Sequence, residues 1–185
     1  MDWIDLKTVL TILHIFGAVI GAGGAYMSDA MFFATVKDEV ISKRELKFLK
    51  IGSNFVWVGL AVLFLSGLGL FLTNPAGYME SSKFLIKMFI VLVIFLNGVI
   101  FHVEHLPRMH RHADTHFPSS DEFIRKRSLL IASGVVSVTS WTFALILGGL
   151  RMIPIDFWTA LVGYMLFEAI AVIIALLISK KIFNF

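Results

Sequence analysis

Hydrophobic residues run almost without interruption through five segments of the chain, and polar residues gather in the short stretches between them. Each segment has the length of about 20 mostly apolar residues that an α-helix needs to cross the hydrocarbon core of a bilayer. The predicted spans are residues 8–34, 51–73, 84–104, 128–150 and 157–179. This pattern predicts an all-α, polytopic membrane bundle of five transmembrane helices in a single domain, residues 1–185.

The composition agrees with a membrane protein and excludes several kinds of chemistry. The chain is 58% hydrophobic and 16% charged, whereas soluble domains average about 45–50% apolar and about 25% charged residues. There is no cysteine, which excludes disulfides, thiolate metal sites and thiol catalysis. The net charge of +3 comes from residues in the connectors, so it indicates membrane topology and not nucleic-acid binding.

Lysine and arginine are unevenly divided between the connectors. The stretches 36–50 and 105–127 and the tail at Lys180 and Lys181 are rich in them, whereas residues 74–82 and 151–156 hold one basic residue. The positive-inside rule places the basic stretches in the cytoplasm. We therefore expect the N-terminus outside and the C-terminus inside, in a bacterial or archaeal cytoplasmic membrane.

Ionisable residues inside spans are costly and indicate function by default. At the helical rise per residue, His14 lies roughly 10 Å below the outer boundary and Glu168 roughly 18 Å, near the midplane. Lys87 lies near the outer end of its span, where a lysine can extend its ammonium group to the interface. Asn97 is expected to bond a neighbouring helix.

The first span carries small residues below its histidine. His14, Gly17, Gly21, Ala25 and Ser28 follow one another at spacings of three and four, so they share a helix face. One interpretation is close packing against another helix. The other is a flat porphyrin ring that lies against the glycines and takes the imidazole as a ligand.

Glu168 also has two interpretations. It is either a neutral acid bonded to a serine of the 128–150 span, or a proton relay and partner for His14.

The third connector is rich in histidine. His112 and His116 would share a face if the segment were helical, which is a common spacing of metal ligands. Pro107, Pro118 and the many charges predict a solvated loop for the stretch from His105 to His116. The chain has no glycine-rich phosphate loop, nucleophile elbow or HExxH motif.

Two stretches carry a resemblance to known families. The first, LHIFGAVIGAGGA, resembles the first span of the copper-resistance D family and of the HemJ-type protoporphyrinogen oxidases. The second, KFLIKMFIVLVIF, resembles the start of the HemJ-type third span, in which a histidine precedes a lysine by two residues. Lys87 matches that lysine, and Leu85 stands at the histidine position. The resemblance implies a small helical membrane protein with a b-type haem on His14.

Three functions are consistent with these features. The first is a membrane haem protein with a redox or electron-transfer role, such as an oxidoreductase with a membrane or soluble redox partner. In it His14 binds the haem iron, Gly17 and Gly21 leave room for the ring, and Lys87 and Met165 complete the site. Met88 is a shallower alternative to Met165 as the second ligand. The second function is a proton or cation transporter that uses His14 and Glu168. The third is a non-catalytic subunit of a membrane complex. A homo-oligomer is compatible with all three.

Overall fold

The computed structural model describes residues 5–37, 42–114 and 121–182, and every regular element in these ranges is helical. The elements are α1 (Leu6–Lys37), α2 (Lys43–Thr73), α3 (Pro75–Met79), α4 (Ser82–Ile100), the π-helical turn η1 (Phe101–His105), α5 (Leu106–Arg111), α6 (Asp121–Gly149) and α7 (Phe157–Ile182). Five helical segments within the described ranges are long and apolar enough to cross a membrane. The prediction of an all-helical membrane protein is therefore confirmed at this level.

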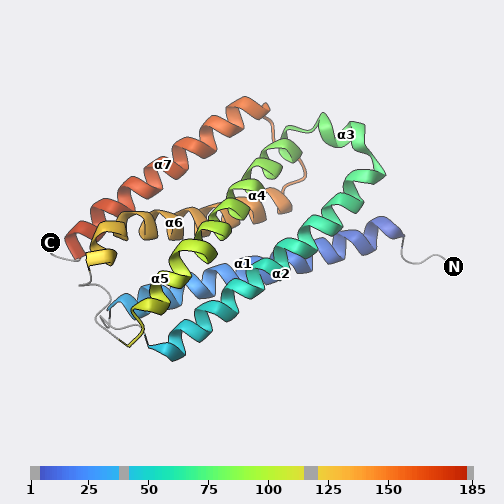
Figure 1. Cartoon of the computed structure of the whole chain (residues 1–185). Coiled ribbons are helices and arrows are strands. Elements are labelled where there is room, and N and C mark those ends of the chain that lie inside the picture. The colour runs from blue at the N-terminus through green and yellow to red at the C-terminus, as the bar shows by residue number, and fades with distance from the viewer. Residues whose placement is uncertain (1–4, 38–41, 115–120, 183–185) are drawn as a thin grey trace.

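The long helices form one bundle with α4 and α6 at its centre (Figure 1). Helices α1 and α2 run side by side along one flank, and α7 lies on the opposite flank against α4 and α6. Many large apolar side chains on the outside of the bundle are exposed, including Phe16, Val19 and Leu65. Such a surface is consistent with contact with lipid.

The helices extend beyond the predicted spans, most clearly at the start of α2, at the end of α4 and at the start of α6, which begins at Asp121 rather than at residue 128. Helix α2 begins at Lys43 rather than at residue 51, because Ser42 and Glu45 form a capping box at its start. No solvated loop follows α4, because the helical path continues from α4 through η1 into α5. It ends at Arg111. The expectation of a loop is therefore wrong for residues 105–111.

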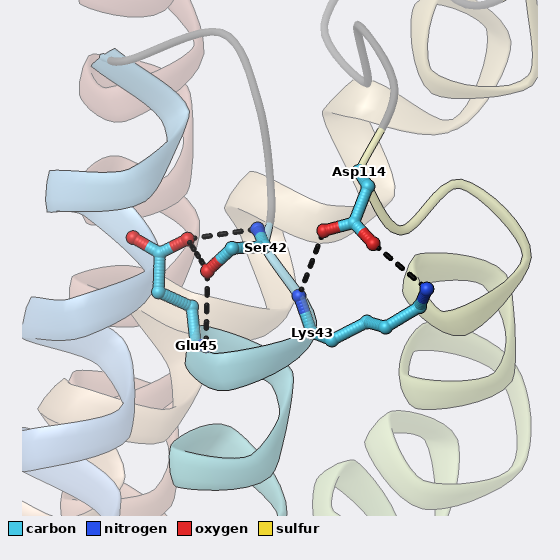
Figure 2. Close-up of polar contacts among 4 residues, drawn as sticks. All are labelled: Ser42, Lys43, Glu45 and Asp114. Carbon is cyan, nitrogen blue, oxygen red and sulfur yellow. Dashed lines mark hydrogen bonds and ion pairs between the residues drawn. The ribbon is translucent and has the colours of Figure 1, made fainter.

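Polar contacts tie the start of α2 to the end of α5 (Figure 2). The Ser42 amide donates to Glu45 Oε2 at 2.8 Å, and the Glu45 amide donates to Ser42 Oγ at 3.2 Å. Asp114 accepts from the Lys43 amide at 3.2 Å and pairs with Lys43 Nζ at 3.0 Å. These bonds from Lys43 hold the pKa of Asp114 below its usual range. Asp114 has a φ of 60°, a conformation that aspartate adopts more readily than most residues.

Glycines allow the backbones of α1 and α2 to touch. A Cβ atom on Gly59 would lie 2.4 Å from Gly21 Cα, and one on Gly24 would lie 2.8 Å from the carbonyl oxygen of Gly52. A Cβ atom on Gly17 would lie 2.9 Å from the backbone nitrogen of Leu63. Real side chains do not tolerate such distances, so the small residues of α1 form a helix-packing seam.

Candidate functional site

Near the N-terminal end of α1, His14 joins three helices through its two ring nitrogens. Its Nδ1 lies 3.0 Å from Ser66 Oγ on α2, and its Nε2 lies 3.3 Å from Lys87 Nζ on α4. An ammonium group only donates, so Nε2 accepts and Nδ1 carries the hydrogen when Lys87 is charged. Ser66 then accepts from Nδ1 and donates its own hydrogen to the Val62 carbonyl at 2.6 Å. Lys87 therefore contacts His14. The expectation that its ammonium group extends to the membrane interface stays a prediction.

This arrangement does not fit a haem. An axial histidine binds iron through one ring nitrogen and usually donates the other to a partner. Ser66 on Nδ1 is therefore compatible with a ligand, but Lys87 Nζ lies at Nε2, where the iron would bind. The ring would also need open space beside Gly17 and Gly21, but Leu63 and Trp141 fill it. A Cβ atom on Gly21 would lie 2.4 Å from Trp141 Cη2.

The predicted second ligands lie on the outer surface of the bundle. Met165 is 52% exposed on α7, which packs against α4 and α6, and Met88 is 48% exposed.

A second cluster surrounds Glu168 between α6 and α7. Glu168 is buried, and Thr139 Oγ1 lies 2.7 Å from both of its carboxyl oxygens. Ser140 Oγ lies 3.3 Å from Glu168 Oε1 and 2.8 Å from the Tyr164 hydroxyl. The predicted bond between Glu168 and a serine of the fourth span is thus present. Among the described residues, no cationic side chain forms an ion pair with this carboxyl group.

The geometry favours a proton on Glu168. Thr139 Oγ1 lies 2.7 Å from the Val135 carbonyl as well as from both carboxyl oxygens. A hydroxyl group has one hydrogen to donate, so it cannot satisfy all of these acceptors. A proton on the carboxyl group supplies a second donor and removes an uncompensated charge from the apolar interior.

The structure does not bring His14 and Glu168 together. The partners of His14 lie on α2 and α4, whereas those of Glu168 lie on α6 and α7. Buried apolar side chains of the main core lie between α4, α6 and α7, among them Ile90, Trp141 and Leu147. The two residues therefore belong to separate sites.

A third site, which the sequence analysis did not identify, is a cavity of about 60 Å³ nearer the C-terminal end of the bundle. Helices α1, α2 and α6 and the α4–η1 segment line it. Its polar lining residues are Ser28, Asp29, Ser53, Asn97, His105, Ser133 and Ser137. Asn97 is used structurally, since it donates to the Ser133 carbonyl at 3.0 Å and accepts from Ser133 Oγ at 2.8 Å. This confirms that Asn97 bonds a neighbouring helix.

Three buried polar atoms on residues that line this cavity have no hydrogen-bond partner within the described part of the chain. They are Ser28 Oγ, Asp29 Oδ2 and His105 Nε2. Each atom has almost no accessible surface, and Ser28 Oγ lies against Gly52 of α2.

Arg108 fixes which nitrogen of His105 carries the hydrogen. Its Nη1 lies 3.4 Å from His105 Nδ1. A guanidinium group cannot accept, so Nδ1 accepts and the hydrogen lies on Nε2, which is buried. His105 is completely buried and ends the π-helical turn η1, and such turns occur frequently at functional sites.

The predicted metal spacing in the third connector is not supported. His116 lies outside the described residues. No group of three or more histidine, cysteine or acidic side chains within those residues is placed to hold a metal ion.

Comparison with protein-family models, curated protein sequences and solved structures gives no match. The resemblance to the copper-resistance D and HemJ-type families therefore stays a prediction.

Proposed function

We propose that this chain conducts protons across the membrane and that Glu168 carries the proton at the centre of the path. The observation that carries the proposal is the setting of Glu168: a buried carboxyl group, near the middle of its span, with only hydroxyl partners and no cationic one. A permanent structural charge would require a counter-ion at this depth. An acid that holds and releases a proton does not require a counter-ion while the proton is bound, because it is then neutral.

Hydroxyl groups on α6 extend from Glu168 toward the cavity. Ser133, Ser137 and Ser140 occur at spacings of four and three, so they lie along one face of the helix. Ser140 contacts Glu168, and Ser133 and Ser137 line the cavity. A polar connection thus runs from the central acid toward the C-terminal end of the bundle.

An apolar barrier lies on the other side of Glu168. Ile86, Ile90, Trp141 and Leu147 are buried in one core cluster, and His14 with Lys87 lies beyond them. Protons would have to cross this barrier through a transient rearrangement of α6 against α4. His14 and Lys87 are placed to exchange a proton with the solution at that end, since their Nε2 and Nζ atoms are in contact.

Proton flux into liposomes tests the proposal. Purified protein in vesicles with an internal pH dye and a potassium diffusion potential should give acidification above that of empty vesicles. Glu168→Gln should lower the rate by at least about tenfold, because glutamine keeps the shape and hydrogen bonds but carries no exchangeable acid proton. Glu80→Gln, outside the spans, is the matched control and should conduct like wild type. Wild-type flux no greater than that of empty vesicles, or full flux through folded Glu168→Gln, would contradict the proposal.

We further propose that the N-terminus faces outside and the C-terminus faces the cytoplasm. The basic residues that motivate this include Lys43 and Arg108, at the end of the bundle where α1 and α5 finish. Since the chain has no cysteine, single cysteines report topology directly.

In intact cells, Met152→Cys should react with an impermeant thiol reagent, and His110→Cys should react only after the membrane is permeabilised. Both positions are exposed. The opposite labelling pattern would reverse the orientation.

An absorption spectrum separates the proton proposal from the haem expectation. Because His14 has two protein partners and its glycine face is filled, protein purified from haem-replete cells should show no Soret band. His14→Ala should have the same spectrum as wild type. A Soret band that His14→Ala abolishes would establish the haem site instead.

A further inference from the structure

We propose that a groove between the N-terminal part of α6 and the C-terminal part of α7 binds an anionic phospholipid, with its phosphate at Arg127 and one acyl chain along α7. The groove has a volume of about 220 Å³. Its lining residues are Arg127, Ser128, Ile173, Leu176, Leu177 and Ser179. These two parts of α6 and α7 lie at the same end of the bundle, near the C-terminus (Figure 1). Binding at this groove does not require that the chain conducts protons.

The groove lies at the level of the lipid headgroups and of the first part of the acyl chains. The apolar spans of α6 and α7 are Arg125–Gly149 and Phe157–Ser179. Arg127 and Ser179 therefore lie within about one helical turn of the span ends, where the hydrocarbon core meets the headgroups. Ile173 precedes Ser179 by six residues, which places it roughly 9 Å deeper in the bilayer. A phospholipid at this surface would have its phosphate beside Arg127 and its upper chain beside Ile173.

The polar and apolar lining residues match the two parts of a phospholipid. Ile173 and Leu177 are 56% and 61% exposed on α7, and they offer an apolar surface to an acyl chain. Arg127 offers a planar guanidinium group, which binds phosphate oxygens in pairs. Ser128 adds a hydroxyl donor beside it. Ser179 Oγ already donates to a backbone carbonyl of α7 at 2.9 Å, so the donors for a phosphate are those of α6.

Arg127 is the basic residue of this stretch that belongs to the groove. It is half-buried, whereas Arg125 and Lys126 are exposed and do not line the groove. Arg127 also has an interaction within the chain. A guanidinium group has five N–H donors, so it can keep that interaction and still bind a phosphate.

The charges around the groove favour an anionic lipid over a zwitterionic one. Among the described residues that line the groove, none is acidic, so the ammonium group of phosphatidylcholine would find no partner there. Lys180 and Lys181 follow Ser179 along the chain and add positive charge to this end of the bundle. Glu122, the nearer of the two acidic residues that start α6, precedes Arg127 by roughly 7 Å along the helix axis. Basic residues that flank a span at the membrane surface attract anionic lipids.

Native mass spectrometry of the purified, delipidated protein tests the site by the affinity for the first lipid bound. Phosphatidylglycerol should bind at least about tenfold more tightly than phosphatidylcholine with the same acyl chains. Arg127→Gln should weaken binding of phosphatidylglycerol at least about tenfold, because it removes a charge-assisted contact. Arg125→Gln is the matched control, since it removes the same charge from the same helix outside the groove. It should weaken binding no more than about threefold.

A further variant blocks the groove and keeps every charge. Ser128 is exposed, so Ser128→Phe should fold, and its ring should occupy the space of the lipid. It should weaken binding of phosphatidylglycerol as much as Arg127→Gln does. Thermal unfolding temperatures in detergent without lipid that match wild type show that the variants are folded.

Four results would each overturn the proposal. The first is equal affinity for phosphatidylglycerol and phosphatidylcholine. The second is an equal loss of affinity in Arg127→Gln and Arg125→Gln, which would assign binding to the charge of the helix end and not to the groove. The third is wild-type affinity in folded Ser128→Phe. The fourth is an unfolding temperature that inorganic phosphate raises as much as phosphatidylglycerol does, which would indicate a site for a free anion.

Discussion

Replacement of Gly59 by leucine is expected to prevent the bundle from folding. A Cβ atom at this position would lie 2.4 Å from both Cα and N of Gly21, and 2.7 Å from the carbonyl oxygen of Gly17. These are backbone atoms, which cannot rotate away as a flexible side chain would. Overpacking usually costs about 1–3 kcal/mol when side chains can adjust. Here α1 and α2 would have to separate along their contact, so the loss should exceed that range.

Gly163→Leu is the matched control for this prediction. Gly163 lies on α7, and a Cβ atom there meets no other atom within 4 Å. The same substitution should therefore leave the folded yield and the thermal unfolding temperature in detergent close to those of wild type. Equal unfolding temperatures for Gly59→Leu and wild type would show that α1 and α2 do not pack as described.

The five long apolar helices could be predicted because a bilayer imposes a minimum apolar length on every span. The ends of the helices could not be predicted in the same way. Ser42 and Glu45 cap the start of α2 with hydrogen bonds to each other. The capped polar residues extend the helix beyond its apolar core. Pro107 also misled the prediction, because the helical path continues past it directly after the π-helical turn.

His14 and Glu168 could be singled out because an ionisable residue in an apolar run is conspicuous at any position. Their partners could not be predicted. The spacing of residues on α1 shows which of them share a face, but it does not tell which helix covers that face. Ser66 and Trp141 are brought to α1 by the packing of α2 and α6, and this packing is what fills the space that a ring would need.

The cavity was missed for a related reason. Asp29 and His105 lie near the ends of their apolar runs, where charged residues are common and unremarkable. The π-helical turn at Phe101–His105 rotates the following residues relative to a continuous α-helix, and nothing in the local sequence marks it. An acidic residue and a histidine near the same end of two spans are only a weak indication that the two side chains share a site.

Replacement of Trp141 by alanine is the other change with a large expected effect. Trp141 is 2% exposed, packs against Gly21 of α1 and also lines the cavity. Removing a buried tryptophan side chain costs about 3–5 kcal/mol in soluble cores. Within a bilayer the loss of packing remains, because lipid tails cannot enter the space that is left. We therefore expect a clearly lower thermal unfolding temperature for Trp141→Ala in detergent.

The same substitution should raise proton flux in the variant that still folds. Trp141 both lines the cavity and belongs to the buried core cluster, so its loss would extend the cavity into that core and admit water there. Faster acidification of vesicles than with wild type, measured at equal amounts of folded protein, is the expected result. Trp158→Ala is the control, since Trp158 is 70% exposed near the start of α7 and its loss should change neither quantity. A folded Trp141→Ala protein with unchanged stability and unchanged flux would show that the indole ring neither supports the core nor closes the path.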